Sequence, residues 1–141
     1  MNTCAREERI QQWFAMWLKK ESGGIEEIFS PDAVYTESWG PSYTGLDAIR
    51  HWFTEWNTRG TVQVWDIRQF FHRDDQTVVE WYFKDAMNDG HADCFEGLSL
   101  ISWSTDGRIC ALKEFGCNTD RYDPYQNGPQ PQFRDTPALW F

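Results

Sequence analysis

Three tight turn signals in the second half of the chain constrain its fold most strongly. After Gly60 the apolar residues no longer recur at helical spacing, and four strand-like segments follow, joined at Asp74-Asp75, Asp89-Gly90 and Asp106-Gly107. An Asp-Gly pair between apolar runs is a strong hairpin signal, because glycine supplies the positive φ that a tight turn needs. The sequence therefore predicts a four-stranded antiparallel meander over residues 61–117.

The first half of the chain predicts two long helices with a strand between them. Apolar side chains recur at helical spacing within residues 5–20 and again over residues 49–56. The second helix follows "TGLD" at 44–47, where Thr44 is expected to cap it. Between the helices, "IEEIF" at 25–29 predicts a helical turn and "DAVYTES" at 32–38 predicts a strand.

The remaining segment predicts an irregular arm. It holds four of the six prolines, so we expect one domain over residues 1–118 and an arm over residues 119–141. The arm is expected to pack on the same domain or on a partner subunit, with Ala138 to Phe141 docking as its apolar end.

Two-residue loops at all three turns would set a specific register. That register places Ser99 between Glu80 and Glu114 in a polar row, beside a row in which two glycines leave room for a ligand near Tyr82. A one-residue slip at a turn would move part of this set to the other face. The opposite face is apolar as well, so we expect a homodimer through the outer sheet face or coverage by the arm.

Composition narrows the classes of partner. Aromatic residues make up 17% of the chain, including 9 Trp, which suggests an aromatic-lined cavity or an apolar partner surface. The net charge of −9 would repel polyanions, so nucleic acid and anionic membranes are not expected partners. The four cysteines show no metal-ligand spacing, so no metal is expected, and free thiols favour a cytoplasmic location.

Three motifs carry a resemblance to a known superfamily. "IEEIFSPDAVYTES", "YTGLDAIRHWF" and "STDGRICALKEF" resemble the SnoaL-like and ketosteroid-isomerase-like branches of the nuclear-transport-factor-2-like superfamily, over residues 5–118. The resemblance implies an α+β fold: a cone-shaped barrel in which a curved antiparallel sheet wraps around N-terminal helices. It places Glu37 where ketosteroid isomerases keep their carboxylate base. Trp13 and Ser99 fall at the positions of the family's oxyanion hole, which uses a tyrosine and a protonated acid.

These patterns together suggest a site. The candidate catalytic acids are Glu37, Glu80 and Glu114. The candidate ligand-binding residues are Trp13, Tyr35, Trp39, Trp52, Trp56, Trp65, Tyr82 and Ser99. Each acid could instead be solvated or paired with a cation, and each ring could be plain core.

Two functions remain open at this point. One is an acid–base enzyme that needs no cofactor, of the isomerase, cyclase or dehydratase class, acting on a small apolar molecule. The alternative is a non-catalytic ligand-binding or dimeric interaction protein of the same fold.

Overall fold

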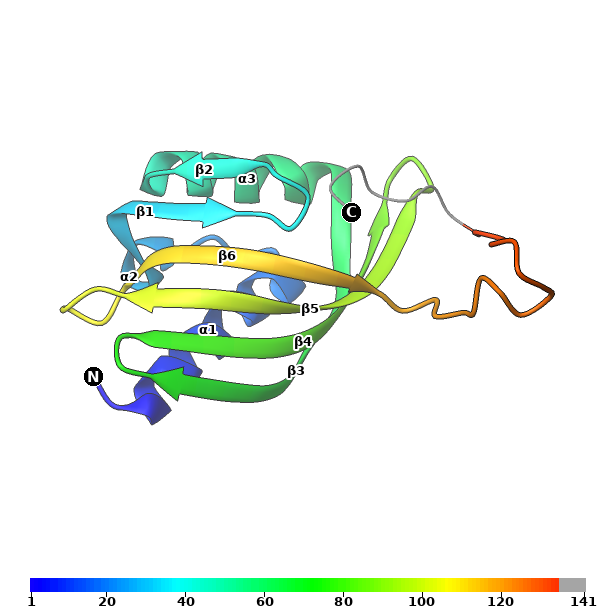
Figure 1. The fold of residues 1–141 in the computed structure, drawn as a ribbon. Coiled ribbons are helices and arrows are strands. Elements are labelled where there is room, and N and C mark those ends of the chain that lie inside the picture. The colour runs from blue at the N-terminus through cyan, green and yellow to red at the C-terminus, as the bar shows by residue number, and fades with distance from the viewer. Residues whose placement is uncertain (135–141) are drawn as a thin grey trace.

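The computed structural model describes residues 1–134, which form three helices and one six-stranded sheet (Figure 1). The helices are α1 (Thr3–Lys19), α2 (Ile25–Ile28) and α3 (Leu46–Arg59). The strands are β1 (Phe29–Thr36), β2 (Ser42–Thr44), β3 (Gly60–Arg73), β4 (Gln76–Met87), β5 (Ala92–Trp103) and β6 (Ile109–Asn118).

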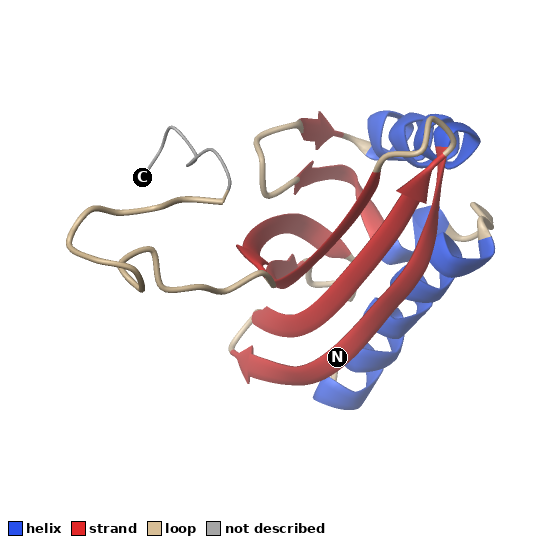
Figure 2. Ribbon diagram, turned by 90° about the vertical axis from the view of Figure 1, so that its right-hand side faces the viewer, coloured by secondary structure: helices blue, strands red, loops and turns tan. Residues whose placement is uncertain are grey.

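The sheet is curved and does not close on itself. Its order is β2-β1-β6-β5-β4-β3, and β1 runs parallel to β6 while the other neighbours are antiparallel. The helices lie on one side of this sheet (Figure 2). The predicted α+β architecture with a four-stranded meander is confirmed, and β2 and the parallel β1–β6 pairing are added to it.

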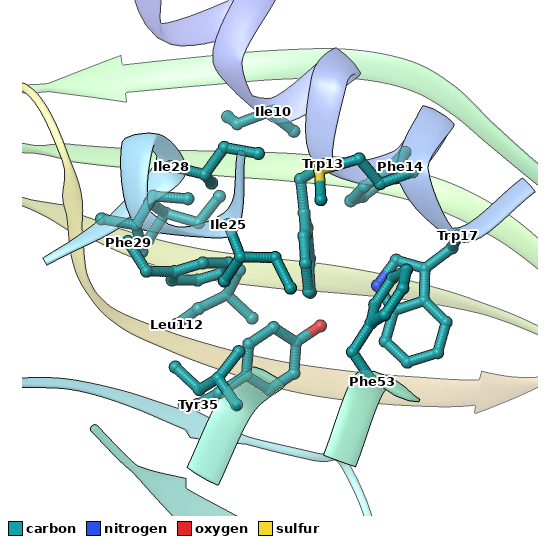
Figure 3. Close-up of a cluster of buried hydrophobic side chains, with 14 of the residues drawn as sticks. Ile10, Trp13, Phe14, Trp17, Ile25, Ile28, Phe29, Tyr35, Phe53 and Leu112 are labelled. Atoms are coloured by element: carbon teal, nitrogen blue, oxygen red, sulfur yellow. The ribbon is translucent and has the colours of Figure 1, made fainter. Parts of the chain in front are cut away.

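The hollow side of the sheet is filled with aromatic rings at its centre. Trp13 of α1 is fully buried, and its ring contacts those of Trp17, Phe29, Tyr35 and Phe53 (Figure 3). The contacts with Trp17 and Phe29 are edge-to-face, and such contacts add to the stability that comes from removing the rings from water. This cluster joins α1 and α3 to the inner face of the sheet.

The start of α3 differs from the prediction. Its N-cap is Gly45, which makes no side-chain capping bond, and Thr44 does not cap the helix. The reason is that Thr44 belongs to β2 and pairs with Val34 of β1, while the Gly45 N–H donates to the Ala33 carbonyl at 2.7 Å. Thr44, which the local sequence predicts as the N-cap of α3, is therefore part of a strand pair instead.

The predicted register between β4 and β5 is wrong by one residue. Glu80 pairs with Leu98 and Tyr82 with Glu96, whereas two-residue loops would have paired them with Ser99 and Gly97. The turn contains three residues, closed by a Met87 N–H to His91 O bond of 2.7 Å, with Gly90 at φ +94°. A three-residue loop of this kind is the next commonest hairpin after the two-residue loop.

This slip decides which residues of β4 face the helices. Because side chains alternate along a strand, Val79 and Trp81 point inward and are buried, while Glu80 and Tyr82 point to the outer face. In β3, the register shifts between Ile67 and Gln69, so Ile67 pairs with Trp81 and Gln69 pairs with Glu80.

The predicted register between β5 and β6 is confirmed. Ser99 pairs with Glu114, although this turn also has three residues, closed between Ser104 and Arg108. A second irregularity, in which Ser102 pairs with Ala111 and Trp103 with Ile109, compensates for the longer turn. Glu114 therefore faces the interior, as predicted.

The described part of the arm, residues 119–134, extends beyond the end of β6 (Figures 1 and 2). Arg121 forms an ion pair with Glu96 of β5, and Arg134 pairs with Asp120 at 2.6 Å. Packing of the arm on the domain or on a partner stays a prediction, and its apolar end, Ala138 to Phe141, lies outside the described residues. Within residues 1–134, none of the helices is long and apolar enough to cross a membrane.

Candidate functional site

A cavity of about 1100 Å³ lies within the described fold. That volume exceeds the range typical of small-molecule sites, roughly 300 to 1,000 Å³. Its walls come from the inner sheet face, the β1–β2 connection, α3 and the end of α1. Aromatic side chains form much of the lining, namely Trp17, Tyr35, Trp39, Tyr43, Trp52, Trp56, Trp65, Trp81, Phe83 and Phe95.

Two carboxyl groups, those of Glu37 and Glu114, lie side by side in this cavity. The parallel register of β1 and β6 pairs Thr36 with Lys113, so the next residues, Glu37 and Glu114, are neighbours on the same face. Adjacent strands lie about 4.8 Å apart. The negative charge of Glu37 contributes to the raised pKa of Glu114.

Glu114 is the more perturbed of the two acids. Part of the residue can be reached from the cavity, but protein surrounds its carboxyl group, and this burial raises its pKa to about 8. The Tyr35 hydroxyl donates a 2.7 Å hydrogen bond to its Oε2, which lowers the pKa but does not offset burial. Glu114 therefore carries a proton at neutral pH.

Glu37 lies half-buried at the end of β1. Burial raises its pKa as well. Two influences oppose burial: the Tyr43 hydroxyl, which donates a 2.7 Å hydrogen bond to Oε2, and the Trp39 side chain. The Glu37 N–H donates to the Pro41 carbonyl at 2.8 Å, which closes the β1–β2 connection and fixes the backbone. Glu37 thus has one tyrosine donor and lies beside a second acid that has another.

Trp52 of α3 holds both tyrosines in place. Its ring stacks on Tyr43 with centroids 4.4 Å apart and planes 12° apart, and it contacts the Tyr35 ring at 4.7 Å. Tyr35 and Tyr43 are paired directly across β1 and β2, so both hydroxyls project from the same face. Burial and the neighbouring carboxyl groups raise the pKa of each tyrosine, which keeps both hydroxyls protonated as donors.

The structure brings most of the predicted site residues together. Glu37, Glu114, Tyr35, Trp39, Trp52, Trp56 and Trp65 all line the cavity. Trp39 is also 70% exposed, as suits a residue in the connection between two strands.

Four predicted residues lie elsewhere. Glu80 and Tyr82 are on the outer face because of the β4–β5 slip, so the expectation that they face the pocket is wrong. Ser99 is buried beneath the cavity, where its hydroxyl accepts the Trp81 indole N–H at 2.9 Å. Trp13 is buried in the core, and its N–H lies near the Tyr35 hydroxyl without reaching hydrogen-bond geometry.

Sequence reasoning missed Tyr43 and Asp85. Tyr43 lies between the predicted strand and the second predicted helix, where we expected no strand, yet Tyr35, Tyr43 and the intervening Gly40-Pro41 are the pattern of a short hairpin. Asp85 follows Trp81 and Phe83 at alternating positions of β4, so only the correct register reveals that it faces inward. No cluster of three or more potential metal ligands occurs within residues 1–134.

The family of the chain follows from its similarity to known proteins. Residues 10–112 match the SnoaL-like domain. The chain belongs to the SnoaL-like family. No curated protein matches the sequence of this SnoaL-like protein.

Solved structures share its fold at low sequence identity. An LEH-like epoxide hydrolase of M. tuberculosis is 11% identical with a TM-score of 0.71, and the match covers 82% of this chain and 84% of that one. A proposed polyketide cyclase of Xanthomonas campestris pv. campestris is 14% identical with a TM-score of 0.71, over 82% and 92% of the two chains. A ketosteroid-isomerase-like protein of Catenulispora acidiphila, in complex with trimethylamine, is 16% identical with a TM-score of 0.69, over 79% and 86%.

Proposed function

We propose that this SnoaL-like protein is an acid–base enzyme that needs no cofactor and moves protons on a small, largely apolar molecule. The observation that carries the proposal is the pair of neighbouring carboxyl groups, Glu37 and Glu114, each held by a tyrosine hydroxyl at 2.7 Å within an aromatic cavity. Two acids whose environments give them different proton occupancies are the usual arrangement for general acid–base chemistry. The reaction class would be an isomerase, cyclase or dehydratase.

The two acids would take different roles. Glu37, the less buried, would accept a proton from an acidic C–H of the substrate. Glu114, protonated at neutral pH, would donate its proton to the oxygen on which negative charge develops. Glu37 would then return its proton to another carbon while the substrate O–H returns its proton to Glu114, so that the isomer leaves and both carboxyl groups regain their starting protonation states.

The similar structures support the fold and leave the substrate open. Their names include a proposed polyketide cyclase and an epoxide hydrolase. The trimethylamine complex concerns a protein that is 16% identical, and it motivates testing ligands with an amino group here as well.

Deuterium exchange would test the proposal without knowledge of the natural substrate. The protein would be incubated in D₂O with 4-phenyl-2-butanone, an apolar ketone, and exchange of the protons next to the carbonyl followed by NMR. We expect the wild type to accelerate exchange and Glu37→Gln to lose at least 100-fold of that acceleration with the ketone still bound. Binding of the ketone by the wild type without exchange would contradict catalysis and favour the binding module.

The outer face supports a second proposal, that two copies associate there. Phe71, Leu98 and Phe115 are 56%, 41% and 50% exposed on that face. A second copy would cover these side chains in a symmetric contact. Leu98→Lys should shift a dimer toward monomer in light-scattering measurements, whereas a monomeric wild type would contradict the proposal.

We also propose a cytoplasmic location. All four cysteines are free, which suits a reducing compartment.

A further inference from the structure

We propose that the same cavity contains a subsite for an organic cation, an ammonium group on the apolar ligand, recognised by Asp85. This inference rests on the proposed function, because it assigns a positive charge to the substrate of the same site. The subsite lies on the part of the inner sheet face that β4 and β5 form before their turn. The acids Asp85 and Asp93 lie there with the rings of Phe83 and Phe95.

Asp85 is an unusual residue for its position. It is an acid that is only 6% exposed, and it lines the cavity on the inner face of the sheet, where most neighbouring positions are apolar. Its Oδ1 accepts the Asp93 N–H at 2.9 Å, and its Oδ2 has no hydrogen-bond partner among residues 1–134. Buried carboxyl oxygens are normally hydrogen-bonded or paired with a cation. Oδ2 is not among the fully enclosed unpaired atoms of the described residues, so it can be reached from the cavity and is placed to accept a hydrogen bond from a ligand there.

The position directly opposite Asp85 is a second acid. Asp85 and Asp93 are register partners in β4 and β5, and like charges directly opposite each other destabilise a sheet. His91 lies 3.2 Å from Asp93, on Oδ2, and makes no hydrogen bond to Asp85. His91 also acts on Asp85 through its charge, which lowers the Asp85 pKa without offsetting burial. The fold thus keeps two carboxyl groups together and leaves the more buried one without a hydrogen-bonded cation.

The other charges around the cavity leave it negative. Besides the protonated Glu114, its lining includes four carboxyl residues, Glu37, Asp85, Asp89 and Asp93, against the positive Arg59 and the titratable His91. The Arg59 guanidinium is already engaged by Glu55 through two hydrogen bonds of 2.7 and 2.9 Å. Low-dielectric walls around charges of one sign concentrate ligands of the opposite sign.

The rings next to Asp85 suit a cation rather than a second neutral group. Phe83 and Phe95 are register partners in the adjoining row, with ring centroids 5.2 Å apart, and Trp65 contacts Phe83 at 5.4 Å. Aromatic faces attract ammonium groups through their quadrupole, most strongly where water is excluded. An ammonium group here would donate to Asp85 Oδ2 while the apolar part of the ligand extends toward Glu37.

A matched pair of ligands tests the charge directly. 2-Phenylethylammonium and 2-phenylethanol have nearly the same shape and differ in the charge of one end. We expect the ammonium ion to bind the wild type at least 10-fold more tightly at pH 7.5, as measured by tryptophan fluorescence quenching and calorimetry. In Asp85→Asn this preference should fall to about twofold or less, with the affinity for the alcohol unchanged.

The variants separate a local effect from net charge. Asp85→Asn retains the oxygen that accepts the Asp93 N–H, and far-UV circular dichroism with thermal unfolding would show that it folds. Asp66→Asn makes the same change of charge at an exposed position of β3 and should keep the full preference.

Each outcome has one meaning. Equal affinity of the wild type for both ligands, or a preference that persists in Asp85→Asn, would overturn the cation subsite and leave the acid–base proposal standing. Failure of both ligands to bind at millimolar concentration would overturn the apolar cavity site itself. Exchange of 4-phenyl-2-butanone tests the proposed function separately, because that ketone carries no charge.

Discussion

The two faces of the sheet use the same residue type in different ways. Glu114, on the inner face, lies in an aromatic cavity with a tyrosine donor, and burial raises its pKa to about 8. Glu80, on the outer face, accepts a 2.6 Å hydrogen bond from Gln69 next to solvent. The face of the sheet on which a strand places a glutamate therefore decides whether burial can raise its pKa and keep it protonated at neutral pH.

The largest difference between the faces should appear in proton transfer. We expect Glu114→Gln to reduce the exchange of 4-phenyl-2-butanone by 100-fold or more, because the amide cannot donate an acidic proton to the developing oxyanion. Glu80→Gln, the matched change on the outer face, should leave the rate within twofold. Equal losses in both variants would show that the effect is structural and would remove the distinction between the faces.

The second largest difference between the two faces should appear in how the free energy of unfolding depends on pH. The folded-state pKa of Glu114 is above its unfolded value of 4.5, so the folded protein holds a proton that the unfolded chain has released. Between about pH 4.5 and 8, this group therefore lowers the stability as pH rises, by up to about 1.4 kcal/mol per pH unit. Above pH 8 both states are ionised, and the loss reaches its full size, on the order of 5 kcal/mol.

Urea unfolding of the wild type and of Glu114→Gln across this range would measure that contribution. The variant should gain stability relative to the wild type as pH rises, whereas Glu80→Gln should follow the wild type. A constant difference between the wild type and Glu114→Gln from pH 5 to 8 would contradict a raised Glu114 pKa.

A smaller effect is expected from the tyrosine donors. Tyr35→Phe removes the hydroxyl that donates to Glu114, so the pKa of Glu114 should rise further. We expect a loss of about 1 to 3 kcal/mol in the free energy of unfolding, larger at pH 9 than at pH 6, because the bond is stronger to the ionised acid. Tyr82→Phe on the outer face should change stability by less than about 0.5 kcal/mol at either pH.

Much of the fold could be predicted from the sequence because its signals are local. The apolar spacing located α1 and α3, and the turn residues located the meander. The register could not be predicted fully, since an Asp-Gly pair is compatible with loops of two or three residues. The β4–β5 and β5–β6 turns both contain three residues. Only in the β5–β6 pair does a second irregularity restore the register expected for a two-residue loop. Glu114 was therefore placed on the correct face and Glu80 was not.

The candidate site was predictable where it depended on strand alternation alone. Tyr35 and Glu37 followed from β1, and their environment followed from the abundance of tryptophan. Asp85 depends on the β4 register, and Tyr43 on the pairing of a three-residue strand, so long-range pairing had to be known first. The coupling of Glu37 with Glu114 depends on a parallel contact between β1 and β6, which are distant in sequence and share no turn.

The most direct measurement of the central claim is an NMR titration of the Glu114 side-chain carboxyl carbon, assigned by its disappearance in Glu114→Gln. The account predicts a midpoint near pH 8, with a smaller upward shift for Glu37. A Glu114 midpoint near 4.5, the ordinary value for a glutamate, would show that the inner face leaves its carboxyl group ionised at neutral pH and would contradict the proposed division between acid and base.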